Sequence, residues 1–212
     1  MEVKFLAKDA PASDRKRERY EEIIKAAGEI FSKKGFHRAR MEEIARSAGI
    51  GKGTVYEYFK SKKHLFVEVI KYFTSKFLDE FKVAARKGKD YKEKLENALG
   101  LLINILHESS GFFELLVRDH WEMDEKLYQW MVKVRSEASK VIEDILSEGI
   151  KSGKLKDISP RIPAMMLIES SRLALFSDAL DGDGKKPDEL NKVIIDVVLN
   201  GISKRSVETD RQ

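Results

Sequence analysis

A glycine-bearing turn between two short helical segments is the feature that most restricts how this chain can fold. Residues 40–65 read RMEEIARSAGIGKGTVYEYFKSKKHL. Apolar residues recur at helical spacing before and after Gly49, and a glycine directly after the last periodic residue is typical of a helix terminus. We therefore expect one helix from about Met41 to Ala48 and a second over Lys52–Phe59. Two short helices joined in this way form the helix-turn-helix motif, whose second helix enters the major groove of DNA.

A longer helix is expected before the motif. Apolar residues between Tyr20 and Phe31 recur three and four positions apart, which predicts a helix with one buried face. Ser13 or Asp14 can cap its start, and Gly35 can end it in a left-handed conformation. This helix and the two helices of the motif can bury one small core between them.

Positive charge is concentrated in the same part of the chain. Residues 13–63 contain 14 Lys and Arg against 8 Asp and Glu, whereas the whole chain contains 40 against 36. This asymmetry indicates an anionic partner, although a solvated basic surface would give the same count. Cations also crowd the N-terminal end of the first helix, where the helix dipole disfavours them, and either a nearby polyanion or simple solubility explains this placement. These residues are Arg15, Lys16, Arg17 and Arg19.

The start of the second motif helix leaves its backbone accessible. Gly51 and Gly53 remove side chains there, so the backbone can approach a phosphate, and a helix N-terminus favours an anion. Lys52 and Thr54 are left to extend outward, at the end of the helix that faces base edges in this motif.

Two tyrosines, Tyr56 and Tyr58, follow on the same helix. Side chains two residues apart on a helix diverge by about 200°. At least one of the two hydroxyls should therefore point outward, where it can donate a hydrogen bond to a phosphate. The alternative for Tyr58 is packing beneath the helix.

These residues together resemble the DNA-binding domain of the TetR family of transcriptional regulators. The resemblance covers about residues 20–66, and beyond them it is only architectural. It is carried by Ile44-Ala45, Ala48-Gly49-Ile50-Gly51, Gly53, Val55-Tyr56, Tyr58-Phe59, Ser61-Lys62 and Leu65, with Ala26–Phe31 and Gly35-Phe36 upstream. The resemblance implies a homodimer that binds a palindromic operator in double-stranded DNA. The residues implied to contact DNA are Arg40, Met41, Gly51, Lys52, Gly53, Thr54, Tyr56, Tyr58 and Lys62, with Arg15, Lys16, Arg17 and Arg19 as additional N-terminal candidates.

Three residues depart from the pattern of the family. Arg40 stands where a threonine usually caps the second helix, and arginine cannot accept the capping hydrogen bond, although it can still contact a phosphate. Gly51 replaces the usual serine at the start of the recognition helix, where glycine is a tolerated cap. Lys63 replaces the usual acid and adds positive charge.

The remainder of the chain is expected to consist of amphipathic helices. Ser61 should cap a long helix that reaches about Arg86. The predicted fold is all-α with about nine helices. It has a helix-turn-helix domain over residues 13–62 and an effector-binding and dimerisation domain over residues 63–203, connected by the shared helix from 61 to about 86. The family resemblance implies that the last two long helices form the dimer.

Bulky residues in the second half either fill the core or line a pocket for an apolar or amphipathic small molecule, such as an acyl chain or a hydrophobic drug. The charged pair Glu169 and Arg172 either anchors the polar head of a ligand or forms a local ion pair, since the two residues are three positions apart. The candidate pocket residues are Phe112, Phe113, Leu116, Trp121, Trp130, Met131, Met165, Met166, Glu169, Arg172 and Phe176.

No motif of enzymatic chemistry is found. The chain has no cysteine, and it shows no nucleophile elbow, phosphate loop or dinucleotide fingerprint, so we expect neither an enzyme nor a cofactor. His120 with its neighbouring acids, and the segment Asp181–Gly184, are weak metal candidates because solvated acids are the commoner explanation. No apolar run is long enough for a signal peptide or a membrane span, so a cytoplasmic protein without a membrane partner is expected.

The favoured hypothesis is a repressor that a small molecule releases from its operator. The alternative is a DNA-binding protein of the same kind without a small-molecule effector, whose second half serves only dimerisation or another partner. A cavity in the second half would favour the first hypothesis, and a filled core would favour the second.

Overall fold

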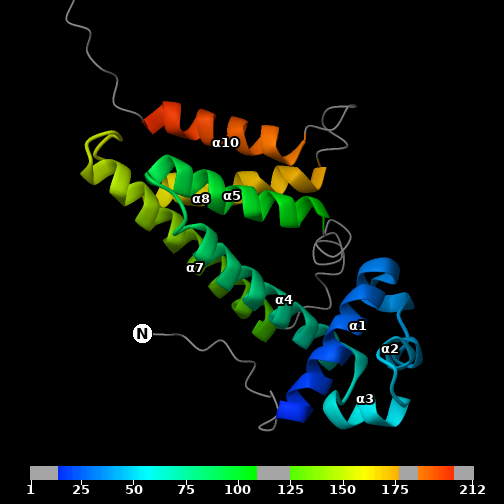
Figure 1. The fold of residues 1–212 in the computed structure, drawn as a ribbon. Coiled ribbons are helices and arrows are strands. Elements are labelled where there is room, and N and C mark those ends of the chain that lie inside the picture. The colour runs from blue at the N-terminus through cyan, green and yellow to red at the C-terminus, as the bar shows by residue number, and fades with distance from the viewer. Residues whose placement is uncertain (1–13, 109–124, 177–185, 203–212) are drawn as a thin grey trace, which may run out of the picture. The chain divides into compact units, whose positions relative to one another are not determined.

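The computed structural model describes residues 14–108, 125–176 and 186–202, and these residues form eight α-helices and one 3₁₀ segment without a β-strand (Figure 1). The all-α fold expected from the sequence is therefore confirmed. The elements are α1 (Asp14–Arg38), α2 (Met41–Ser47), α3 (Lys52–Tyr58), α4 (Lys62–Ala84), α5 (Tyr91–Glu108), α7 (Glu125–Lys151), α8 (Arg161–Ser170), η2 (Ser171–Phe176) and α10 (Pro187–Ile202). None of the described helices is long and apolar enough to cross a membrane.

The described residues form two compact units. Unit 1 comprises residues 14–78 and 125–134, and unit 2 comprises residues 79–108, 135–176 and 186–202. Helices α4 and α7 thus contribute residues to both units. The functional boundary predicted near residue 62 stays a prediction, since the units are defined by packing alone.

Aromatic side chains form the centre of unit 1. Phe31 of α1 meets the ring of Phe66 of α4 edge-on with 5.2 Å between ring centroids, and Phe36 lies 5.0 Å from the same ring. Phe59, at the end of α3, is fully buried and lies 5.2 Å from the ring of Tyr20. The three N-terminal helices and the start of α4 therefore share one core, as the spacing of apolar residues predicted.

The turn between α2 and α3 is a Schellman motif centred on Gly49. The N–H of Ile50 donates to the carbonyl of Ala45, and the N–H of Gly49 donates to the carbonyl of Arg46. Gly49 has φ +67°, a conformation that a side chain disfavours. The glycine therefore fixes the angle at which α3 leaves α2.

Helix α4 begins at a side-chain cap, as predicted. The hydroxyl oxygen of Ser61 accepts a hydrogen bond from the N–H of His64 over 3.0 Å. The N-cap of α2 is Arg40, which makes no side-chain cap bond, as its chemistry requires. Helix α2 therefore depends on its tertiary contacts, and Ile44 on its inner face is fully buried.

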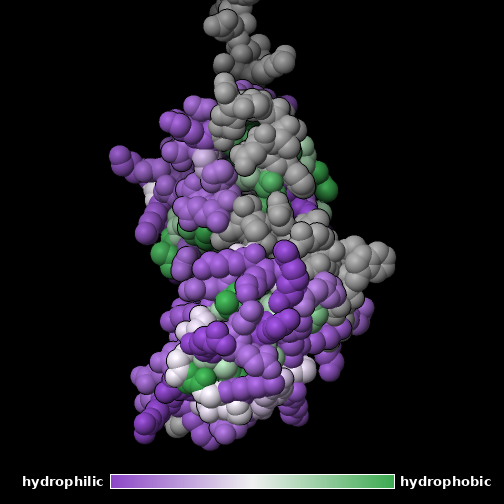
Figure 2. Space-filling model, turned by 90° about the vertical axis from the view of Figure 1, so that its right-hand side faces the viewer, coloured by the Kyte–Doolittle hydropathy of each residue, from purple (hydrophilic) through white to green (hydrophobic). Residues whose placement is uncertain are grey.

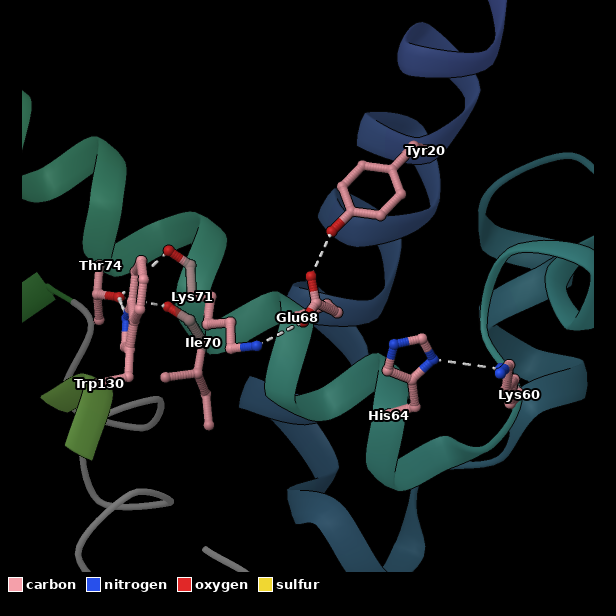
Figure 3. A network of polar contacts seen from close by, with 8 residues as sticks. All are labelled: Tyr20, Lys60, His64, Glu68, Ile70, Lys71, Thr74 and Trp130. Atoms are coloured by element: carbon pink, nitrogen blue, oxygen red, sulfur yellow. Dashed lines mark hydrogen bonds and ion pairs between the residues drawn. The ribbon is translucent and has the colours of Figure 1, made fainter. Parts of the chain in front are cut away.

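Two reciprocal hydrogen bonds connect α1 with α4 inside unit 1. The hydroxyl of Tyr20 on α1 donates to the carboxylate of Glu68 on α4 over 3.0 Å, and the hydroxyl of Tyr72 on α4 donates to Glu21 on α1 over 3.0 Å. Glu68 is only 2% exposed, and Lys71 of its own helix donates to its second oxygen (Figure 3). A buried carboxylate with two donors makes this a specific contact and not a surface ion pair.

The first turns of α7 also belong to unit 1. Leu127 is fully buried in the aromatic core, and Trp130 and Met131 pack against that core. The indole N–H of Trp130 donates to the hydroxyl of Thr74 over 3.1 Å, and this hydroxyl donates in turn to the carbonyl of Ile70 (Figure 3). A segment far along the chain therefore completes the unit that contains the helix-turn-helix motif.

In unit 2, α5 packs against α10 and η2, and α8 also contacts α10. The side-chain amide of Asn191 on α10 donates to the carbonyl of Glu96 over 3.0 Å, beside Gly100 of α5. A Cβ at Gly100 would lie 3.1 Å from the Asn191 nitrogen, so the glycine permits this close approach. Within the same unit, Lys82 of α4 pairs with Glu137 of α7 over 3.0 Å.

Candidate nucleic-acid interface

Helix α3 is anchored by one face and open on the other. Val55 and Phe59 are fully buried, whereas Lys52 and Gly53 are exposed and Tyr56 is 44% exposed. The apolar side has the i, i+4 spacing that points two side chains into the core. The predicted core residues are therefore buried and Lys52 is exposed as predicted, whereas Thr54, also predicted to extend outward, is half-buried.

The two glycines at the start of α3 face open space. A Cβ built at Gly51 or Gly53 would have no neighbouring atom within 4 Å. Packing within the protein therefore does not require glycine at either position. The accessible backbone at the N-terminal end of α3 is consistent with the phosphate approach predicted from the sequence.

Lys52 of α3 is paired across the turn with Glu42 of α2. The ammonium hydrogen-bonds the Glu42 carboxylate, and it also lies 5.8 Å from the ring centroid of Tyr56. The hydrogen bond with Lys52 is the main cause that lowers the pKa of Glu42, and the same bond raises the pKa of Lys52. Sequence reasoning missed Glu42, because only the geometry of the turn brings two residues ten positions apart together.

The two tyrosines of α3 have different surroundings. The ring of Tyr58 is half-buried against the core and lies 6.4 Å from the ring of Phe59. Packing beneath the helix, the alternative considered for Tyr58, is therefore the arrangement found. Tyr56 is the tyrosine that extends outward.

Two further predicted contacts, Arg40 and Met41, stand at the start of α2. Arg40 is exposed and available to an anion. Met41 is only 5% exposed and is part of the core, so its side chain does not face outward as a DNA contact would require. Its periodicity with the buried Ile44 and Ala45 gave the signal for this packing.

The cations at the start of α1 are exposed and partly paired along the helix. Arg17 lies 3.5 Å from Glu21, and Arg19 donates to Glu22 over 2.7 Å. Arg15 and Lys16 are also exposed. Surface pairs of this kind contribute little to stability, so the cations can exchange these partners for phosphates.

Lys62 does not extend outward as a phosphate contact would. Its ammonium donates to the carbonyl oxygens of Phe36, His37 and Ala39 at 2.8, 3.1 and 3.1 Å. The structure therefore connects Lys62 to the end of α1 and to the link that leads into α2. Its predicted phosphate contact remains untested.

The candidate pocket residues do not converge in the described part of the chain. Trp130 and Met131 lie in unit 1, whereas Met165 and Met166 of α8 are 46% and 52% exposed and so do not line an enclosed space. The buried positions of α8 are Pro163, Ala164, Leu167 and Ile168, so Met165 and Met166 lie on its exposed side. Phe112, Phe113, Leu116, Trp121 and the Phe176 side chain lie outside the described residues.

Glu169 lies between two arginines. Its carboxylate is 3.6 Å from Arg172, three residues along the chain, and 3.3 Å from Arg135 of α7. The local ion pair expected as one alternative is therefore present. In the described ranges no group of three or more His, Cys, Asp or Glu is placed to hold a metal, and His120 and Asp181–Gly184 lie outside them.

Helices α8 and α10 leave apolar side chains exposed, and we call this set the α8–α10 face. Its residues are Ile162, Met165, Met166, Val193 and Val197. In the view of Figure 2, hydrophilic side chains predominate and apolar ones form small patches. An apolar set on two neighbouring helices is typical of a protein interface.

Comparison with known proteins identifies related sequences over most of the chain. Residues 23–69 match the family model described as bacterial regulatory proteins of the tetR family, and residues 88–202 match the tetracyclin repressor-like C-terminal domain. The fatty acid metabolism regulator protein of Bacillus subtilis is 24% identical over 191 residues, which cover 88% of this chain and 97% of that protein. The HTH-type transcriptional activator FasR of Mycolicibacterium smegmatis is 28% identical over 165 residues, which cover 76% and 74%.

Among solved structures, the transcriptional regulator FadR from Bacillus subtilis in complex with stearoyl-CoA has the same fold. It superposes with a TM-score of 0.70 at 22% identity, covering 86% of this chain and 99% of that one. FadR is described as a transcriptional regulator and FasR as a transcriptional activator.

Proposed function

Because the chain belongs to the TetR family of DNA-binding transcriptional regulators, we propose that it is a dimeric repressor that an apolar or amphipathic small molecule releases from a palindromic operator. The observation that carries the DNA-binding part is the arrangement of α3. Its apolar face is fixed in the core of unit 1, and its outer face presents Lys52, Gly53 and Tyr56. A rigid helix with an accessible N-terminal end is what reading a major groove requires.

The α8–α10 face supports dimerisation through the last two long helices. Val197 is 67% exposed although α10 is a strongly amphipathic helix packed on α5 and α8. Burying such side chains against a second copy would remove apolar area from water at about 25 cal/mol per Å². A two-fold dimer presents two recognition helices to half-sites roughly 34–36 Å apart, which makes a palindromic operator the expected target.

A long-chain acyl-CoA is the effector class that we propose to test first. The relatives supply the reason, since one is named a fatty acid metabolism regulator and another structure contains stearoyl-CoA. An acyl thioester combines a long apolar chain with an anionic head, which agrees with the amphipathic class expected from the sequence. A ligand changes operator affinity only by binding the free and DNA-bound conformations with different affinities.

Selection of bound duplexes from a random pool tests the DNA-binding part. We expect a two-fold symmetric consensus, and Lys52→Ala and Tyr56→Ala should weaken its binding while helicity and dimerisation are retained. Wild-type binding by both variants would show that α3 is not the reading helix.

A titration with stearoyl-CoA, oleic acid and free coenzyme A tests the effector part. We expect stearoyl-CoA to raise the thermal midpoint and to release the selected duplex, and free coenzyme A to do neither. If no acyl compound shifts the midpoint or releases DNA, this effector class is wrong, while the DNA-binding part stands on its own experiment.

A further inference from the structure

We propose that Lys62 is a positioning residue that holds the helix-turn-helix motif in place through the backbone of α1, and that it keeps this role when DNA is bound. The inference rests on the proposed DNA-binding function. It gives Lys62 a different role from the phosphate contact that the family resemblance implies.

All the donors of the Lys62 ammonium group are used within the protein. A lysine ammonium carries three N–H donors. The carbonyl oxygens of Phe36, His37 and Ala39 lie 2.8, 3.1 and 3.1 Å from the Lys62 nitrogen, so each donor has an acceptor at normal hydrogen-bond length. The nitrogen also lies 4.6 Å from the ring centroid of Phe36, where a cation is attracted by the ring. No donor is left for a phosphate.

The three carbonyls lie where α1 ends, and among the described residues no backbone N–H donates to them. Gly35, at φ 77° and ψ 166°, interrupts the helical geometry directly before them. The carboxyl end of a helix carries partial negative charge, and its terminal carbonyls need external donors. Lys62 supplies three of these donors at once.

Lys62 is the first residue of α4, three residues after the fully buried Phe59 at the end of α3. One side chain therefore joins the end of α1 and the link into α2 to the first residue of α4, four positions after the last residue of the recognition helix. If this joint is lost, α3 loses one of the constraints on its angle and depth, even though its own outward residues are unchanged.

A phosphate contact and a positioning role predict different results for Lys62→Ala and Lys62→Arg. An arginine binds phosphate at least as well as lysine does. Its planar guanidinium, however, cannot direct three N–H donors from a single nitrogen towards three carbonyls. The two variants should be compared with Lys60→Ala, which removes the same charge from an exposed residue two positions earlier whose printed hydrogen bond uses only its backbone N–H. The readouts are the unfolding midpoint and the slope of log affinity against log salt for a duplex selected by the wild-type chain.

We expect Lys62→Ala and Lys62→Arg to lower the unfolding midpoint by about 3–8 °C, because hydrogen bonds to a charged group are lost. At a temperature where every variant is folded, both should bind the selected duplex on the order of tenfold more weakly, the loss expected when one base contact goes out of reach. Their salt slopes should equal that of the wild type. Lys60→Ala should leave the midpoint unchanged.

Three results would overturn the proposal. The slope of log affinity against log salt would reveal a phosphate contact if its magnitude fell by about 0.9 in Lys62→Ala and returned to the wild-type value in Lys62→Arg. A lower midpoint with wild-type affinity would show a purely structural lysine. Wild-type behaviour in both readouts would show that the three hydrogen bonds do not matter. If the wild-type chain selects no duplex at all, the proposed function itself has failed, and the midpoints still report on the joint.

Discussion

Replacing Tyr20 by phenylalanine should destabilise the protein clearly more than the same replacement of Tyr72. Each tyrosine donates one hydrogen bond of 3.0 Å to a glutamate on the opposite helix, so both variants remove the same oxygen from the same pair of helices. The difference is burial. Glu68, the partner of Tyr20, is 2% exposed, whereas Glu21, the partner of Tyr72, is half-buried.

The loss of unfolding free energy in each variant depends on whether another donor can reach the carboxylate once the tyrosine hydroxyl is removed. Glu68 keeps its bond from Lys71, but water cannot reach the oxygen that Tyr20 served. A hydrogen bond to a charged group contributes about 1.5–3 kcal/mol, and a buried acceptor left unpaired loses all of it. Water can replace the Tyr72 hydroxyl at Glu21, so Tyr72→Phe should cost less than about 1 kcal/mol. The rings stay in both variants, and with them the contact of Tyr20 with Phe59.

Urea unfolding at one fixed protein concentration measures both costs, because stability depends on concentration if the chain is a dimer. An unchanged m-value with a lower midpoint for Tyr20→Phe is the expected result. In a thermal melt the difference corresponds to about 2–4 °C per kcal/mol for a chain of this size. Equal costs for the two variants, or a larger cost for Tyr72→Phe, would refute the argument that burial sets the strength of the α1–α4 contact.

Three other predictions follow from single residues. Gly49→Ala should lower stability by about 1 kcal/mol or more in urea unfolding, because the residue holds φ +67° with no neighbour within 4 Å, and an unchanged midpoint would show that the turn relaxes. Glu42→Gln should raise affinity for random-sequence DNA more than for the selected duplex in a competition assay, because it removes an acid that pairs with Lys52, and an unchanged ratio of the two affinities would contradict this. Val197→Asp should convert dimers into monomers in light scattering without loss of helicity, whereas Lys192→Asp, at another exposed position of α10, should not, and dimers in both variants would place the interface elsewhere.

The helix-turn-helix region was predictable from sequence because local signals agreed there. A helix is predicted by the spacing of Ile44 and Ala45, its end by Gly49, and the start of the long helix by Ser61. The observed α2 and α3 end one residue before the predicted ends. Local rules also identified Tyr56 and Tyr58 as diverging side chains. They could not decide which of the two faces the core.

The sequence did not predict features that depend on contacts between distant residues, or on which of several apolar positions of a helix are buried. In α8 the exposed Met165 and the buried Ile168 are both apolar, so the apolar pattern alone does not determine which residues are buried. Glu42 and Lys62 gave no local signal at all. Their partners are 10 and between 23 and 26 residues away, at places that only the folded turn and the end of α1 bring near.

The pairing of the basic residues changes what their number means for DNA binding. The excess of Lys and Arg over residues 13–63 suggested a surface of cations free to grip phosphates. In the structure Arg19, Lys34 and Lys52 bind carboxylates on α1 and α2. Such exposed pairs are weak and can be exchanged for phosphates, so they limit affinity without preventing contact. Lys62 differs because its acceptors are backbone carbonyls at a helix end, to which no backbone N–H of the described residues donates. Counting cations therefore overestimates the number of phosphate contacts. Only lysines and arginines that can exchange their present partners for water or phosphate should contribute to the dependence of operator affinity on salt.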